Sequence, residues 1–172
     1  MPEIAVRSAS RTASESRAER AILFCLRIAF GWTFLYAAIH HLGDDRFVVG
    51  FLSHTKTFHD VYAPFTGPAI APILTVLVEY GHLLIGLSLL AGLMVRLSAP
   101  FAILLMLLYW TAHMDFPYIE NANNWIVDYH IVYALTLAWL FVRRAGHVWG
   151  LDRYAAGLRW FREHPAAYAL VG

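Results

Sequence analysis

Long apolar stretches are the sequence feature that most constrains this fold. Four stretches, at about 21–42, 69–95, 97–116 and 125–142, are apolar along their length. Each is near the roughly 20 helical residues needed to cross a bilayer core about 30 Å thick. A helix of a soluble bundle would need a polar outer face, and AILFCLRIAFGWTFLYAAI, from Ala21 to Ile39, has none. The sequence therefore predicts an all-α integral membrane protein with a four-transmembrane-helix bundle.

The low content of charged residues supports this class. Only 15% of the residues are charged and 59% are hydrophobic, whereas about a quarter of the residues of a soluble domain are charged. The net charge of +1 gives no reason to expect a nucleic acid as a partner. Cys25 is the one cysteine of the chain, which excludes an internal disulfide and a CxxC redox pair. Any redox chemistry must then come from a bound cofactor or a partner protein.

The distribution of Lys and Arg predicts how the bundle is oriented. Ten of these residues fall on one side of the predicted spans: Arg7, Arg11, Arg17, Arg20, Arg96, Arg143, Arg144, Arg153, Arg159 and Arg162. The opposite side has Arg46 and Lys56. Because short loops rich in Lys and Arg stay in the cytoplasm, both termini are predicted to be cytoplasmic (N-in/C-in).

The segments outside the spans are predicted to differ from one another. Residues 1–20, rich in Ser, Ala and Arg, are predicted to form a disordered cytoplasmic tail. The outer loop 43–68 is rich in aromatic residues, and we expect a partly helical cap over the membrane domain 21–145. In the cytoplasmic tail 146–172, apolar residues recur at helical spacing from Leu151, which predicts a short amphipathic helix on the membrane surface.

Ionisable side chains inside the predicted spans are the candidate functional residues. Each costs several kcal/mol in hydrocarbon unless it is paired or hydrated. Seven of the nine histidines fall in the outer half of the protein: His40, His41, His54, His59, His82, His113 and His130. The sorting of positive charge acts on Lys and Arg and does not explain this bias. A site that opens to the outer face would explain it.

We therefore predict a cavity in the outer half of the bundle, formed by Glu79, His82, His113 and either Asp128 or His130. Glu79 and Asp128 are the candidate catalytic groups, because a buried carboxylate can relay protons. The candidate cofactor-binding residues are His41, His82, His113, His130 and Tyr109.

Structural alternatives stay open for the same residues. Arg27 lies in the inner half of the first predicted span, and its long side chain could form an ion pair with Glu79. Polar residues also join transmembrane helices through hydrogen bonds without a catalytic role. Glu79 and His82 have the Glu-x-x-His spacing of metal sites in helix bundles, although a second copy is missing. Metal or haem binding is therefore left undecided.

Several stretches of the chain match the pattern of one known family. They are GWTFLYAAIHHL after Arg27, FLSHTKTFH in the outer loop, EYGHLLIGLSLLAGLMVRLSA, LLMLLYW, NNWIVDYHIVYAL and RAGHVWGLD. Together they cover about residues 24–153, over which the chain resembles the DoxX/DoxD-like family of prokaryotic membrane proteins. Its named members include the membrane subunit of a thiosulfate:quinone oxidoreductase. The resemblance implies a multi-pass protein of the bacterial or archaeal cytoplasmic (inner) membrane that passes electrons from an outer-side donor to quinone.

The leading functional hypothesis is a membrane subunit of a quinone-dependent oxidoreductase that acts on a sulfur compound or a thiol. A quinone would enter from the lipid, and His82 or His130 would donate a hydrogen bond to a ring carbonyl. Glu79 or Asp128 would relay protons, and a separate partner subunit on the outer side would bind the donor. The alternatives are a His-rich metal or haem protein and a non-enzymatic anchor or assembly subunit. A homo-oligomer is compatible with each of them.

Overall fold

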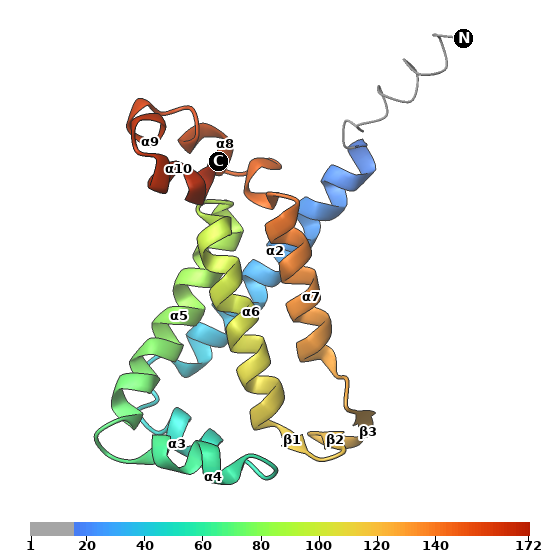
Figure 1. The fold of residues 1–172 in the computed structure, drawn as a ribbon, viewed down its shortest axis with the longest axis vertical. Helices are drawn as coiled ribbons and strands as arrows, with labels where there is room; N and C mark the ends of the chain where they lie inside the picture. Colours follow the sequence, from blue (N-terminus) through green and yellow to red (C-terminus); the bar gives the residue numbers. More distant parts are fainter. Residues whose placement is uncertain (1–15) are drawn as a thin grey trace.

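Long helices form the body of the computed structural model, which describes residues 16–172 (Figure 1). They are α2 (Arg17–His41), α5 (Ala71–Ala91), α6 (Val95–Ala112) and α7 (Tyr129–Val142). The first three are long and apolar enough to cross a membrane, whereas α7 has 14 residues and is shorter. The described residues therefore form a mostly helical protein with three candidate membrane spans.

Short elements form a cap at one end of the molecule, at the bottom of Figure 1. Between α2 and α5 lie α3 (Phe47–Ser53), α4 (His59–Tyr62) and the 3-10 helix η1 (Ala63–Thr66). Between α6 and α7 lies an antiparallel sheet of β1 (Met114–Asp115), β2 (Tyr118–Ile119) and β3 (Asn121–Trp125), in the order β1-β2-β3. In its register Met114 lies opposite Ile119, and Tyr118 lies opposite Trp125. The loop between the first two long helices is thus partly helical, as its sequence indicates.

Backbone and side-chain hydrogen bonds join the two parts of the cap. The N–H of Thr57 donates to the carbonyl of Met114 (3.0 Å), and the N–H of Phe116 donates to Thr57 Oγ1 (2.8 Å). Lys56 and Asp115 form an ion pair (2.6 Å). The α3–α4 segment and the sheet therefore form one structure, although about 60 residues separate them in sequence.

The opposite end, called here the junction end, holds the α5–α6 turn and the C-terminal segment (Figure 1). This segment consists of the 3-10 helix η2 (Ala145–His147), α8 (Asp152–Ala155), α9 (Arg159–Glu163) and α10 (Pro165–Val171). Three short helices thus stand where the sequence predicts a single amphipathic helix. Gly157 and Pro165 are poor residues for the interior of a helix, which accounts for the interruptions.

The structure also corrects the boundaries of the last two predicted spans. Helix α6 ends at Ala112, and the sheet occupies residues that the sequence assigns to a span and a loop. Pro117 and the Asn-rich residues 121–124 are weak helix formers. Helix α7 begins at Tyr129, because Asp128 Oδ1 accepts a hydrogen bond from the N–H of His130 (3.0 Å) and caps the helix.

The predicted disordered tail falls largely outside the described residues. Residues 1–15 are not described, and residues 17–20 form the first turn of α2. Ser16 caps this helix, with its Oγ accepting from the N–H of Glu19 (3.1 Å).

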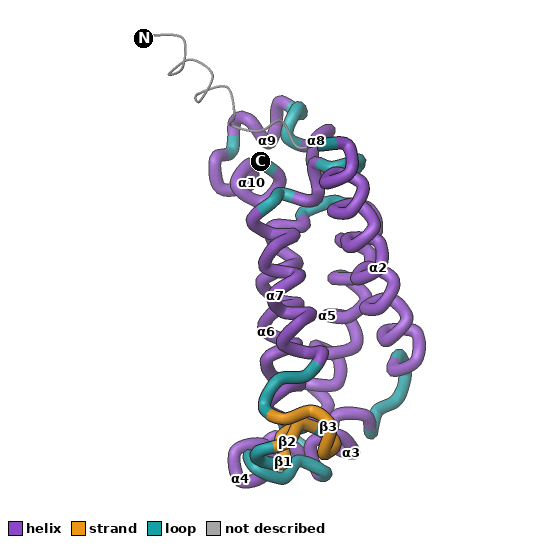
Figure 2. The backbone as a smooth tube through the Cα atoms, turned by 90° about the vertical axis from the view of Figure 1, so that its right-hand side faces the viewer, coloured by secondary structure: helices purple, strands orange, loops and turns teal. Residues whose placement is uncertain are grey.

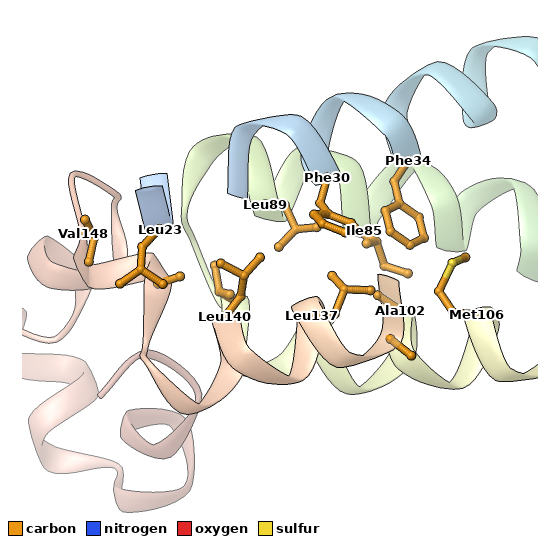
Figure 3. Close-up of a cluster of buried hydrophobic side chains, with 13 residues drawn as sticks. Leu23, Phe30, Phe34, Ile85, Leu89, Ala102, Met106, Leu137, Leu140 and Val148 are labelled. Carbon is orange, nitrogen blue, oxygen red and sulfur yellow. The ribbon is translucent and has the colours of Figure 1, made fainter. Parts of the chain in front are cut away.

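The long helices pack as two pairs around one apolar core. Helix α2 packs mainly against α5, and α6 packs mainly against α7. Figure 3 shows core side chains that come from all of these helices: Leu23, Phe30, Phe34, Ile85, Leu89, Ala102, Met106, Leu137 and Leu140. Figure 2 shows that α7 runs alongside α6. Helix α7 therefore packs in the same core as the three candidate spans.

Glycine permits the close contact within the α2–α5 pair. A Cβ atom at Gly86 would lie 2.6 Å from the backbone nitrogen of Leu35, and one at Gly31 would lie 2.8 Å from that of Leu90. Such distances are too short for any side chain. Close backbone approach through small residues is the usual means by which transmembrane helices associate.

Arg27 organises the junction end. Its side chain is fully buried. Its Nη1 donates to the carbonyls of Leu89 (2.6 Å) and Leu90 (3.1 Å), and its Nη2 donates to those of Val148 (3.3 Å) and Trp149 (3.4 Å). The last carbonyls of a helix lack intrahelical partners and carry partial negative charge. The guanidinium therefore satisfies the end of α5 and fixes the segment after α7 to it.

The Arg27–Glu79 ion pair considered from the sequence is not formed. The guanidinium of Arg27 points to the junction end, where backbone carbonyls take its hydrogen bonds. The carboxylate of Glu79 lies toward the cap, where it accepts a hydrogen bond from the N–H of Gly43 (3.2 Å). The two residues stabilise different ends of the bundle.

Asp152 completes the junction. Its carboxylate accepts hydrogen bonds from the N–H groups of Met94 (2.6 Å) and Val95 (3.2 Å) at the start of α6. Burial raises the pKa of Asp152, and these two hydrogen bonds act in the opposite direction. Gly92, with φ +64, ends α5 and leaves room for Arg27, because a Cβ there would lie 2.5 Å from Nη1.

The first prediction concerns the α2–α5 contact. Gly86→Ala should lower the melting temperature in detergent, because the added methyl group collides with the backbone of Leu35. Gly81→Ala is the matched control on the same helix, since nothing lies within 4 Å of a Cβ there. This control should be neutral or stabilising by up to about 1 kcal/mol, the helix-propensity difference between the residues. Equal melting temperatures for the two variants would contradict the close contact.

The second prediction concerns the junction. Arg27→Lys should lower the free energy of unfolding by about 2–4 kcal/mol, because an ammonium group cannot serve four carbonyls and each lost charged hydrogen bond is worth about 1.5–3 kcal/mol. Arg17→Lys, at an exposed position of the same helix, is the control and should unfold like the wild type. The measurement is thermal or chemical unfolding in detergent. An unchanged Arg27→Lys protein would refute the structural role of the junction.

Candidate functional site

Four of the predicted site histidines and Tyr109 surround one cavity near the cap. The cavity has a volume of about 310 Å³, at the lower end of the range for small-ligand sites. It is called the histidine cavity here. Its lining residues are Thr33, Phe34, Ala37, His41, Phe47, Phe51, His82, Met106, Tyr109, His113, Tyr129, His130 and Tyr133. Residues from α2, α3, α5, α6 and α7 thus meet at one place.

His130 and Asp128 form the tightest polar pair at the cavity. His130 Nδ1 lies 2.6 Å from Asp128 Oδ2, and both side chains are buried. The other oxygen of the same carboxylate caps α7. Asp128 therefore fixes the ring orientation of His130 and would stabilise its imidazolium form. In the neutral form, with the proton on Nδ1, the unprotonated Nε2 is an acceptor.

His113 lies against His130. Their ring centroids are 5.0 Å apart, and the ring planes differ by 25°. His113 Nδ1 donates to the carbonyl of Tyr109 one turn earlier in α6 (2.9 Å), because a carbonyl can only accept. In its neutral form His113 therefore also has Nε2 as an acceptor. Two adjacent imidazoles with fixed rings can exchange protons with a bound ligand or with each other through water.

His82 and Tyr109 also line the cavity, and the ring of Tyr109 lies 6.1 Å from that of His130. His82 Nδ1 donates to the carbonyl of Val78 (2.7 Å), which leaves Nε2 to accept from the hydroxyl of Tyr109 at 3.4 Å. The ring of His41 lies 6.2 Å from that of His82 and 3.8 Å from that of Phe47. Tyr109 can therefore donate either to His82 or to a ligand that enters the cavity.

Aromatic and apolar residues complete the walls, and the sequence analysis missed part of this set. Phe34 and Met106 belong to the apolar core and also form the inner wall (Figure 3). Phe47 and Phe51 come from α3 in the cap. Phe34 could have been found from His41, because positions seven apart lie on the same face of a helix.

The cavity reaches the outside of the bundle between α2 and α7. Thr33 of α2 and Tyr129 of α7 line it and are exposed, with 44% of Tyr129 accessible. These helices belong to different pairs and share few contacts. If the bundle stands in a bilayer, this opening faces lipid.

Glu79 is not among the residues that line the histidine cavity. It is buried one helical turn from His82, and it holds the start of the cap through Gly43. The remaining cap-end histidines, His40, His54 and His59, also lie outside this cavity. The structure thus brings together His41, His82, His113 and His130, with Asp128 behind His130.

The described residues contain no group of three or more His, Cys, Asp or Glu side chains placed to hold a metal ion. Three of the four cavity histidines, His82, His113 and His130, donate from Nδ1 to a carbonyl or a carboxylate of the protein. The arrangement suits hydrogen bonding to a polar, planar ligand among aromatic rings.

A second cavity of about 310 Å³ lies beside the first, within the cap. Its walls carry charged and polar side chains, among them Lys56, Asp115, Glu120 and His54. His113 and Phe51 line both cavities. His113 therefore stands between the histidine cavity and a polar space at the end of the molecule.

Comparison with known proteins identifies the family of the chain. A family model described as DoxX matches residues 22–114, more than half of the sequence. No curated protein and no solved structure matches. The matched segment contains Arg27, His41, His82, Tyr109 and His113, whereas Asp128 and His130 follow it. The match agrees with the apolar helices of the structure. The chain therefore belongs to the DoxX family of membrane proteins.

Proposed function

We propose that this protein is the membrane subunit of a redox complex and passes electrons from an outer-side sulfur compound or thiol to membrane quinone. The histidine cavity binds the quinone ring. The observation that carries the proposal is the convergence of four histidines and Tyr109 on one cavity that opens between α2 and α7. Family membership supports the same class of function, since the family is linked to quinone-related redox subunits.

The proposed orientation places the cap outside and the junction end in the cytoplasm of a bacterial or archaeal cytoplasmic membrane. The N-terminal end of α2, the α5–α6 turn and the C-terminal helices share one end (Figure 1). Among the described residues, that end holds eight of the Lys and Arg residues, and the cap holds two, Arg46 and Lys56. Helix α7 acts as the fourth span because it packs in the same core as the other three.

In this proposal His130 and Tyr109 bind the two carbonyl oxygens of the ring. A protonated His130 donates from Nε2, while Asp128 accepts from Nδ1 and stabilises the imidazolium. Tyr109 turns its hydroxyl from His82 to the ligand. Phe47, Phe51 and Tyr133 pack against the ring from the cavity walls.

The redox step balances with a thiol donor. Two thiols become one disulfide and release two electrons and two protons, and the quinone takes up two of each to become the quinol. A partner subunit docked on the cap binds the donor, because the described part of this chain has only Cys25, which lies on α2 outside the histidine cavity. Protons reach the ring through His113 from the polar cavity of the cap.

Topology provides the third prediction. Reporter fusions at the C-terminus should give a cytoplasmic signal, and reporters inserted between Lys56 and Pro64 should give an outside signal. An even number of spans puts both termini on one side. An outside signal from the C-terminal fusion would show that α7 does not span, and the proposed outer location of the cavity would fail.

The fourth prediction tests ring binding. His130→Ala should weaken binding of decylubiquinone to the purified protein by about 10- to 100-fold, the effect of one charged hydrogen bond of about 1.5–3 kcal/mol. Asp128→Asn should weaken binding about as much in a folded protein, because Asn keeps the cap of α7 and loses only the charge. The measurement is equilibrium binding in detergent, with thermal unfolding of each variant beside it.

His164→Ala is the matched control, since His164 lies on the far end of the molecule beside Trp160. It should bind decylubiquinone as the wild type does. Loss of folded protein in step with loss of binding in both site variants would favour a purely structural role for the polar residues. A wild-type protein that binds no quinone would overturn the proposed function.

A further inference from the structure

A third cavity lies between α5 and α6 beneath the cap. It has a volume of about 270 Å³. Its walls are aliphatic and aromatic, with Leu74 and Val78 on α5, Leu105 and Leu108 on α6, and Leu52 and Phe65 in the cap. None of the described residues that line it carries a charge. Such a space can hold hydrocarbon but offers little to a polar ligand.

The polar atoms nearest this cavity are already engaged. The hydroxyl of Tyr62 lies 2.6 Å from Thr111 Oγ1 and 3.2 Å from the carbonyl of Leu108. The hydroxyl of Tyr109 faces His82. The apolar character of the cavity is therefore a property of its whole wall.

This third cavity, called the apolar cavity here, shares a wall with the histidine cavity. Phe47, Phe51 and Tyr109 line both. The rings of Phe47 and Phe51 are stacked at 6.1 Å, and that of Phe51 meets Tyr109 edge-on at 5.3 Å. Phe47 and Phe51 sit on α3, a helix of seven residues. Three aromatic rings therefore line the boundary between the histidine cavity and the apolar cavity.

The apolar cavity also reaches the outside of the bundle. Leu108 and Phe65 line it and are 45% and 39% exposed. Figure 1 shows α5 and α6 close together at the junction end and apart near the cap. The two cavities thus extend from the α2–α7 side of the bundle to its α5–α6 side.

We infer that the apolar cavity holds the prenyl tail of the quinone whose ring occupies the histidine cavity. This inference rests on the proposed function. A quinone has a polar ring and a long hydrocarbon chain. The histidine cavity suits the ring, and the apolar cavity that shares its wall suits the chain. The tail leaves between α5 and α6 into the lipid. The surrounding lipid solvates a hydrocarbon tail as well as the apolar cavity does. The cavity therefore selects and aligns the tail through close packing.

The test compares two probes: duroquinone, which has no tail, and decylubiquinone, which has a ten-carbon tail. Leu74→Trp fills the apolar cavity from α5 and should weaken decylubiquinone binding about tenfold, while duroquinone binding stays within about twofold of the wild type. Leu105→Trp fills the cavity from α6 and should act in the same way. The second variant serves where the first does not fold.

Leu77→Trp and Leu104→Trp are the matched controls, because both leucines are exposed on the same helices and line none of the three cavities. Both should bind both probes normally. Suppose that the wild type binds both probes, and that the filled variants weaken the binding of neither probe or of both probes equally. The tail site is then refuted and the ring site stands. If the wild type binds neither, the proposed function itself fails. Altered phospholipid co-purification with unchanged decylubiquinone binding would assign the cavity to a lipid acyl chain and overturn the inference.

Discussion

The buried guanidinium of Arg27 is the interaction on which the rest of the structure depends. A charge inside an apolar bundle is costly unless hydrogen bonds or an opposite charge compensate it. Here it meets four backbone carbonyls from two segments, the end of α5 and the chain that follows α7. Asp152 holds the start of α6 beside it. One charge therefore ties α2, α5 and the C-terminal segment together, and Asp152 adds α6.

This arrangement determines where a cavity can form. The helix pairs α2–α5 and α6–α7 are fixed to each other at the junction end, and the apolar core fills the space that follows (Figure 3). Toward the cap α5 and α6 move apart (Figure 1). Side chains of Phe34 and Met106 end the core and begin the cavity. The histidines of the cap end therefore surround a space that the packing of the bundle leaves open.

The sequence predicted the helical membrane class and five of the residues that line the cavity, because hydropathy and helix direction together give the depth of a side chain. Of the residues expected around one cavity, His82, His113 and His130 line it, whereas Glu79 does not. Helix direction does not show how far a side chain reaches, so Arg27 and Glu79 were considered a pair although they serve opposite ends. The cap needed contacts between residues far apart in sequence, such as Thr57 with Met114. Local patterns do not contain such contacts, and the sheet and the cavity walls from α3 were missed.

Phe51 lines the polar cavity, the histidine cavity and the apolar cavity. It belongs to α3, a short helix of the cap. In the proposed complex, a partner subunit that displaces α3 would therefore change all three cavities in a single movement. Binding of a partner to the cap and binding of a membrane ligand would then be thermodynamically linked, so that each would alter the affinity for the other.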